Sequence, residues 1–484
     1  MKIKRISGAI MAVIMSVSML LMGCTNNATD ITADNTGTIM QENEQQQEST
    51  SGTEEQVEEN IPAETYENSE DGGHAIEDNG EEKSYSNANV VKTGESDGDE
   101  ADFYGENSAV FATNGAKLSL SNMNISTNGT HANAVFSYGD GTVVNISDST
   151  IETTGNCSGG LMTTGGGTTN AANLTIHTTG NSSAAIRSDR GGGVVTVNGG
   201  DYTTDGKGSP AIYSTANITV NDAALTSTSS QGVVVEGKNS VTLNNVVLNA
   251  DNNTKNSDKS DYYQAVMIYQ SMSGDADTGL AQFTANGGSI FNANGDVFFV
   301  NNTATDISLS GVEIVNNGDG VFLRAAAAGW GKDGENGGKV NLTASDQKID
   351  GDMIVDDISV LNLCLKDGSS FSGAINPDGA AGDVYVELTD GSKWILTGDS
   401  CIKSLTCDVD SIDLNGYTLT VDGKTYTAGS KAEGEAIEIK INESRGDMTP
   451  PSGNEPPEKP DGAPPEKPNG EGGPHDGNPP DKPD

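Results

Sequence analysis

The chain has 484 residues and a formal net charge of −44, and only 33% of its residues are hydrophobic. A charge of this sign and size excludes nucleic acid and anionic membrane surfaces as partners, but it is compatible with divalent cations. The length and composition indicate one folded body of about 350 residues with polar segments on either side.

The amino terminus has the pattern of a secretory signal. A basic start precedes an apolar run over residues 6–22, which is typical of a signal peptide rather than of a spanning helix. The following Leu21-Met22-Gly23-Cys24 resembles a bacterial lipobox. This resemblance implies removal of residues 1–23, diacylation of Cys24 and an extracytoplasmic protein anchored by lipid to the bacterial cell membrane. An ordinary signal peptide with an incidental cysteine is the alternative.

Residues 24–84 come next and are rich in Glu, Gln, Thr, Asn and Ser, with few large apolar residues. Such a segment cannot bury enough apolar area to fold, and its charges repel one another. We therefore expect a disordered acidic linker up to residue 84.

A tetrapeptide theme then returns along the chain as small residue, branched aliphatic, variable residue, and small or apolar residue. Successive aliphatic positions lie 25, 26, 25, 26, 21, 33, 31 and 24 residues apart. The aliphatic positions are Val110, Val135, Leu161, Ile186, Ile212, Val233, Val266, Val297 and Val321. Two further short strands with alternating apolar residues follow each theme, so each repeat predicts one coil of three strands.

These features predict an all-β fold, a single-stranded right-handed parallel β-helix over residues 85–440. Thr127, Thr153, Thr178 and Thr204 recur two residues after the third strand's apolar residue, and we expect their hydroxyls to cap turn backbone groups. An antiparallel sandwich is the alternative, but it does not explain why each column of positions keeps its character over nine repeats.

If the aliphatic column points inward, its neighbours point outward and form an apolar and aromatic column. From this column and the one two residues further on come the candidate ligand-binding residues: Phe136, Tyr138, Arg187, Asp189, Tyr213, Glu236, Tyr269, Phe298 and Phe322. Coils stack at about 4.8 Å, comparable to one sugar residue, so a linear glycan could lie along the column. Alternatively, insertions at 251–262, 270–280 and 325–338 cover it.

Evidence for catalysis is sparse. Arg187, Asp189 and Glu236 share the outward face, with carboxylates about 10 Å apart, near the upper limit for inverting glycosidases. We assign no catalytic residue. Asp97, Asp99 and Asp102 have a spacing that could hold Ca²⁺, but it does not match the EF-hand loop.

The histidines and cysteines of the chain show no motif. His74, His131, His177 and His475 have no ligand spacing and are predicted to lie on the surface. Cys157, Cys364, Cys401 and Cys407 are expected to be free thiols.

Near the carboxyl terminus Asp367-Gly368-Ser369 recurs as Asp390-Gly391-Ser392, which aligns Phe371 with Trp394. These coils resemble the closing coils of bacterial adhesin and autotransporter β-helices. Residues 441–484 are rich in proline and are predicted to be a disordered spacer.

Across residues 85–440 the chain resembles the pectate-lyase-like β-helix superfamily, particularly adhesin-like surface lipoproteins and carbohydrate-binding β-helices. The resemblance implies adhesion or polysaccharide binding, with a polysaccharide or a host or cell-surface protein as partner. No cofactor is required, although Ca²⁺ is compatible, and no active-site motif carries over. A polysaccharide lyase or glycoside hydrolase, or a spacer that binds nothing, remains open.

Overall fold

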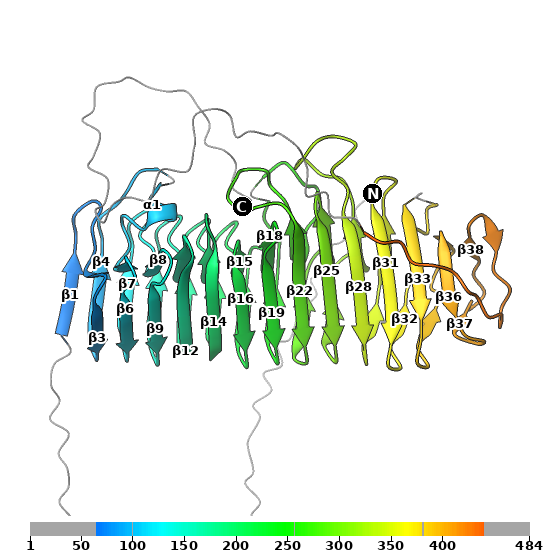
Figure 1. The fold of residues 1–484 in the computed structure, drawn as a ribbon, viewed down its shortest axis with the longest axis horizontal. Helices are drawn as coiled ribbons and strands as arrows, with labels where there is room; N and C mark the ends of the chain where they lie inside the picture. Colours follow the sequence, from blue (N-terminus) through cyan, green and yellow to red (C-terminus); the bar gives the residue numbers. More distant parts are fainter. Residues whose placement is uncertain (1–63, 99, 256, 380–381, 440–484) are drawn as a thin grey trace, which may run out of the picture. The chain divides into compact units, whose positions relative to one another are not determined.

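The computed structural model describes residues 64–98, 100–255, 257–379 and 382–439. Parallel strands lie side by side along this part of the chain, and each coil pairs with the next (Figure 1). The predicted parallel β-helix is confirmed. The predicted signal peptide with Cys24, and the predicted proline-rich spacer at 441–484, lie outside the described residues.

The first face of each coil contains the strand that carries the tetrapeptide theme. These strands form an 11-stranded parallel sheet. They are β2 (Ile76–Asn79), β5 (Val110–Thr113), β8 (Val135–Tyr138), β11 (Leu161–Thr164), β13 (Ile186–Ser188), β15 (Ile212–Ser214), β18 (Val233–Glu236), β21 (Gln264–Tyr269), β24 (Asp296–Asn301), β27 (Val321–Ala325) and β30 (Asp352–Val355).

The second face contains the next strand of each coil, and these strands pair in parallel from one coil to the next. They are β3 (Glu82–Ser86), β6 (Lys117–Ser121), β9 (Val143–Ser147), β12 (Gly167–Thr178), β14 (Gly193–Thr204), β16 (Asn217–Asn221), β19 (Ser240–Asn244), β22 (Leu280–Asn286), β25 (Ala304–Ser310), β28 (Lys339–Ser345), β31 (Val360–Lys366), β33 (Asp383–Leu388) and β36 (Ser404–Cys407). β12 and β14 continue around the corner into the third face, which joins both faces into one 21-stranded sheet.

The third face completes each coil. It contains β1 (Glu64–Asn68), β4 (Ala88–Lys92), β7 (Asn124–Thr127), β10 (Thr150–Thr153), β17 (Ala224–Ser227), β20 (Val247–Ala250), β23 (Ser289–Asn292) and β26 (Glu313–Asn316). A four-stranded sheet follows, with β29 (Lys348–Asp350), β32 (Ser370–Ser372), β34 (Lys393–Ile395) and β37 (Ile412–Asp413), and a small sheet contains β35 (Ser400–Ile402), β38 (Leu419–Val421) and β39 (Lys424–Thr425). The helix α1 (Glu100–Tyr104) lies between β4 and β5.

The expected start of the β-helix at residue 85 is wrong. β1 and β2 precede it and pair in register with β4 and β5 of the next coil. Ile76 is buried in the core and supplies the inward side chain of β2. The acidic composition of this segment had instead indicated disorder.

The predicted inward column of aliphatic residues forms the core along the first face. Val135 pairs with Leu161, and the register continues through Ile186 and Ile212 to Val233, all fully buried. Branched aliphatic side chains pack well on such a surface, and each coil buries them against its neighbours.

The register changes at β24 and again within β27, and two predicted outward residues are inward. Phe298, rather than Val297, pairs with Val266 after the 31-residue repeat, which shifts this strand by one position. In β27 the register shifts between Val321 and Leu323, on either side of Phe322. Phe298 and Phe322 lie in the main core, with their ring centroids 5.5 Å apart, so the expectation that these two rings face outward is wrong.

Threonine hydroxyls hold the corner of several coils. The hydroxyls of Thr153, Thr178 and Thr204 donate to carbonyl oxygens five residues later, at 2.5–2.6 Å, as predicted. The prediction is wrong for Thr127, whose buried hydroxyl has no hydrogen-bond partner in the described chain. At the closing end, Phe371 pairs with Trp394 as expected, with stacked rings 5.5 Å apart.

Candidate functional site

The aromatic column on the outer side of the first face is covered. Phe111, Phe136 and Met162 form a buried cluster against which Tyr138 packs, and Tyr213, Val234, Met267, Tyr269 and Phe299 belong to a second one. Phe136 and Tyr269 are fully buried and Tyr213 is 7% exposed. Of the two alternatives for this column, the structure therefore favours covering segments.

The cover comes from α1 and from the predicted insertions. The ring of Tyr104 lies 5.8 Å from that of Tyr138. The ring of Trp330, in the third insertion, lies 5.3 Å from that of Tyr269. A further contact joins two insertions, because the backbone N–H of Gly329 donates to the carbonyl of Lys259. The insertions thus pack on one another as well as on the sheet.

Arg187 and Asp189 lie beneath this cover as a buried ion pair. Nη2 of Arg187 is 3.0 Å from Asp189 and 3.2 Å from Asp102, a residue of α1. Burial by itself would lower the pKa of Arg187, but the two carboxylates outweigh it and raise that pKa. This arrangement is typical of a charge held permanently by its partners, and it leaves Arg187 poorly placed to meet a substrate.

Glu236 forms the second buried polar group. The hydroxyls of Tyr213 and Tyr269 and the hydroxyl and backbone N–H of Ser271 all donate to its carboxylate. Burial nevertheless raises the pKa of Glu236 to about 7. Four donors stabilise the charged form less than the loss of water destabilises it.

The predicted calcium residues do not form a group in the described chain. Asp97 is exposed, Asp102 is fully buried beside Arg187, and Asp99 lies outside the described residues. Calcium prefers six to eight oxygen ligands. The groups that contact Asp102 include an imidazole, a guanidinium and an amide nitrogen, none of which is an oxygen ligand for calcium.

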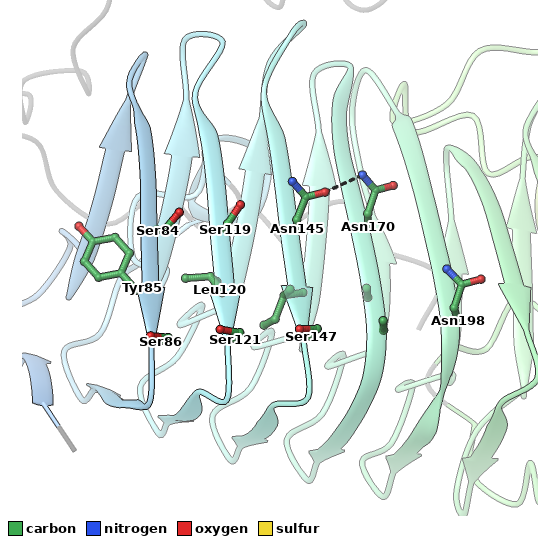
Figure 2. Close-up of a pocket in the computed structure, with 13 residues that line it drawn as sticks. Ser84, Tyr85, Ser86, Ser119, Leu120, Ser121, Asn145, Ser147, Asn170 and Asn198 are labelled. Carbon is green, nitrogen blue, oxygen red and sulfur yellow. Dashed lines mark hydrogen bonds between the residues drawn. The ribbon is translucent and has the colours of Figure 1, made fainter. Parts of the chain in front are cut away.

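The open candidate site lies on the second face instead. A groove of about 520 Å³ crosses β3, β6, β9, β12 and β14. We call it the serine–asparagine groove, and it is lined by Ser84, Tyr85, Ser86, Ser119, Leu120, Ser121, Asn145, Ile146, Ser147, Asn170, Ala171, Ala172 and Asn198. Figure 2 shows hydroxyl and amide side chains from neighbouring strands along the same side of the sheet. None of the lining side chains carries a charge.

The amide groups of the groove are held by one another. Nδ2 of Asn170 donates to Oδ1 of Asn145 at 3.0 Å (Figure 2). A second row of asparagines, two positions further along the strands, begins at Asn198 and includes Asn221 and Asn244, with amide-to-amide hydrogen bonds of 2.9 and 2.8 Å. An asparagine amide has two N–H donors and one oxygen acceptor, so each amide in such a row keeps a further donor or acceptor for a ligand.

The sequence contained a signal for this groove. Ser119 and Ser121 flank the inward Leu120, and Asn145 and Ser147 flank the inward Ile146 in the next coil. The alternation that predicted the inward side chains therefore also specified a polar outer surface. The aromatic residues, which usually mark binding surfaces, lie instead in covered clusters on the first face.

Comparison with protein-family models, with curated proteins and with solved structures finds no match for this chain. Among the residues that the structure describes, no helix is long and apolar enough to cross a membrane. The class that the fold defines is the parallel β-helix, and the arguments for function come from the surfaces of the coils.

Proposed function

We propose that the chain is an extracytoplasmic bacterial lipoprotein whose β-helix binds neutral polysaccharide through the serine–asparagine groove. The observation that supports this most is the groove itself, open to solvent and lined by hydroxyls and amides without a charged side chain. Such groups donate and accept hydrogen bonds, as sugar hydroxyls require.

The geometry of the groove suits a linear ligand. Strands in neighbouring coils lie about 4.8 Å apart, so equivalent polar groups recur at a distance comparable to one sugar residue. The outward side chains of Ser84, Ser119, Asn145 and Asn170 pair in register on successive strands, so a hydroxyl or an amide is present at each step.

Charge favours a neutral glycan over an acidic one. The chain has 70 acidic residues against 26 basic ones, so its field repels uronic acid polymers. A lyase acting on such polymers would also need an accessible basic residue. Arg187 is buried between Asp102 and Asp189, and Arg190, although 38% exposed, is paired with Asp275. Binding is therefore a better supported function than polysaccharide cleavage.

The lipid anchor and the surface location rest on the lipobox-like Leu21-Met22-Gly23-Cys24 and on the superfamily resemblance. A location outside the cytoplasm would present the groove to cell-wall, capsular or host glycans. It also agrees with an adhesive role.

A glycan array probed with the full chain tests the proposal, and the double variant Asn145→Ala/Asn170→Ala tests the groove. Loss of two amides should weaken binding of the selected neutral glycan about tenfold or more. Both side chains are exposed, so the melting temperature should stay nearly unchanged. Titration calorimetry measures the affinity.

The matched control is Thr226→Ala/Asn249→Ala, which removes a similar hydrogen-bonded pair from the third face. Its affinity should equal that of the unchanged protein. Equal losses in both double variants would contradict a site in the groove. Absence of binding to any neutral glycan would favour the spacer, and release of cleaved products would favour an enzyme.

A further inference from the structure

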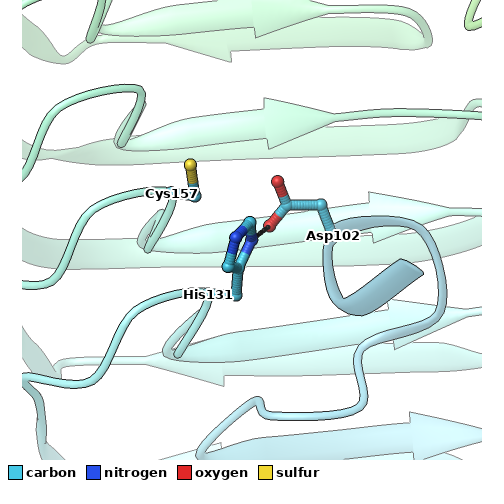
Figure 3. A group of neighbouring side chains, drawn as sticks. All are labelled: Asp102, His131 and Cys157. Atoms are coloured by element: carbon cyan, nitrogen blue, oxygen red, sulfur yellow. Dashed lines mark hydrogen bonds and ion pairs between the residues drawn. The ribbon is translucent and has the colours of Figure 1, made fainter. Parts of the chain in front are cut away.

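Three side chains that bind metals in proteins meet at one edge of the covered face. Asp102, His131 and Cys157 each offer a ligand atom, and these atoms all lie within 4.8 Å of one another (Figure 3). Nδ1 of His131 lies 3.1 Å from Oδ1 of Asp102. The side chain of His131 is 11% exposed, so the expectation of a plain surface histidine is wrong for this residue.

The repeat of the coil brings two of these residues together. The backbone N–H of His131 donates to the carbonyl of Asn156, and the N–H of Cys157 donates in the same way to the carbonyl of Asn181. His131 and Cys157 have φ angles of 55° and 54°, so they occupy the same turn position in successive coils. Equivalent side chains of neighbouring coils necessarily lie close together. The positive φ angles of His131 and Cys157 are therefore explained by the shared turn geometry and give no evidence of catalysis.

Asp102 reaches the same place from a different element. It lies on α1, and Figure 3 shows its carboxylate next to the ring of His131. Its second carboxylate oxygen, Oδ2, accepts a hydrogen bond from Arg187 at 3.2 Å, and Nδ2 of Asn133 lies 3.5 Å from Oδ1. A carboxylate that binds a metal through one oxygen is commonly oriented by such contacts to the rest of the group.

We propose that Asp102, His131 and Cys157 form a binding site for a zinc-like transition metal ion. Thiolate and imidazole are the ligands that Zn²⁺ prefers, and three protein ligands leave a fourth position for water or another ligand. The donor set is too soft and too small for Ca²⁺.

The charges around the cluster also suit a divalent cation. The thiolate of Cys157 and the carboxylate of Asp102 together neutralise a charge of +2. Arg187 and Asp189 neutralise each other at 3.0 Å. A bound Zn²⁺ therefore leaves this buried region without net charge, which lowers the cost of burying its ionic groups.

Titration of the reduced, metal-free full chain with Co²⁺ and then Zn²⁺ tests the site. We expect a thiolate-to-cobalt charge-transfer absorption that saturates at one equivalent and that Zn²⁺ abolishes. Cys157→Ser should remove this absorption. His131→Asn should weaken Zn²⁺ binding by more than about 100-fold, because the loss of an outer partner alone costs 10- to 100-fold.

Both substitutions suit the backbone. Ser182 occupies the same turn position in the next coil with φ 53°, and asparagine tolerates this region as histidine does. Cys364→Ser, on β31, is the matched control and should bind like the unchanged chain. Circular dichroism and the melting temperature check that every variant folds.

Two results would overturn the proposal. One is an absorption that persists in Cys157→Ser or disappears in Cys364→Ser. The other is Cys157 alkylation at a rate that saturating Zn²⁺ leaves unchanged, which would indicate a metal-free thiol beside an imidazole. A glycan-binding result leaves this test unaffected, because the cluster and the groove share no residue.

Discussion

Glu236 illustrates how burial controls single residues beneath the covering segments. Its carboxylate receives hydrogen bonds from two tyrosines and from Ser271, yet its pKa is raised to about 7. Arg187, also buried, keeps its charge because Asp102 and Asp189 contact it directly. Hydrogen bonds from neutral donors thus compensate for lost water less well than opposite charges do.

The raised pKa of Glu236 predicts a pH-dependent stability. Folded Glu236 binds its proton more tightly than an unfolded glutamate, whose pKa is about 4.3. This tighter proton binding therefore stabilises the folded state fully below pH 4.3, and the stabilisation is lost as the pH rises to about 7. Between pH 5 and pH 8 the free energy of unfolding of the unchanged protein should fall by roughly 2 kcal/mol relative to that of Glu236→Gln. Urea unfolding of both proteins at the two pH values measures this difference, and parallel pH profiles would contradict it.

Tyr213 is one of the candidate ligand-binding residues that the sequence predicts, and its burial changes the expected effect of its removal. Tyr213→Ala should destabilise the fold by about 3 to 5 kcal/mol, because a buried ring is replaced by a cavity. Thermal unfolding provides the measurement. Tyr417→Ala, at a 42% exposed site, should change stability little. An unchanged melting temperature for Tyr213→Ala would mean that the column is open to solvent after all.

At the scale of the element, glycines set how closely coils can stack. A Cβ added to Gly129, Gly155, Gly180 or Gly206 would lie 1.8–2.0 Å from the carbonyl oxygen of the preceding member of the column, which for Gly129 is Gly94. Such distances are far below van der Waals contact. Glycine at these positions therefore permits the turn of one coil to rest on the turn of the next.

Gly180→Ala should consequently separate adjacent turns and destabilise the coil by about 3 kcal/mol or more. Gly311→Asn is the control. It has φ 61° with open space around it, and Asn245 occupies the equivalent corner at φ 53°. Guanidinium unfolding should show a large loss for the first variant and almost none for the second. Equal effects would contradict a steric role for the glycine column.

At the scale of the whole described chain, repetition made the fold predictable. The column from Val110 to Val266 and the caps formed by Thr153, Thr178 and Thr204 were predicted correctly, because successive coils repeat the same physical requirement. Single events that break the period were not predictable in this way. The inward Phe298 depends on the length of one insertion, and the cover over Tyr213 depends on how separate loops fold back.

The residues of the candidate sites also divide into those that the repeat predicts and those that it does not. The polar residues flanking Leu120 were accessible from alternation alone. His131 and Cys157 are 26 residues apart, one full coil, so the period also contained the signal for their contact. Asp102 could not be placed, because α1 is an element outside the repeat.

NMR of the full chain with 15N-labelled asparagine, with and without its best-binding neutral polysaccharide, tests most directly whether ligands bind the second face. The side-chain amide signals of Asn145 and Asn170, which are exposed in the groove, should shift as the polysaccharide is added. The side-chain amide signal of Asn249, on the third face, should stay in place. Unchanged signals of Asn145 and Asn170 in the saturated complex would contradict the account.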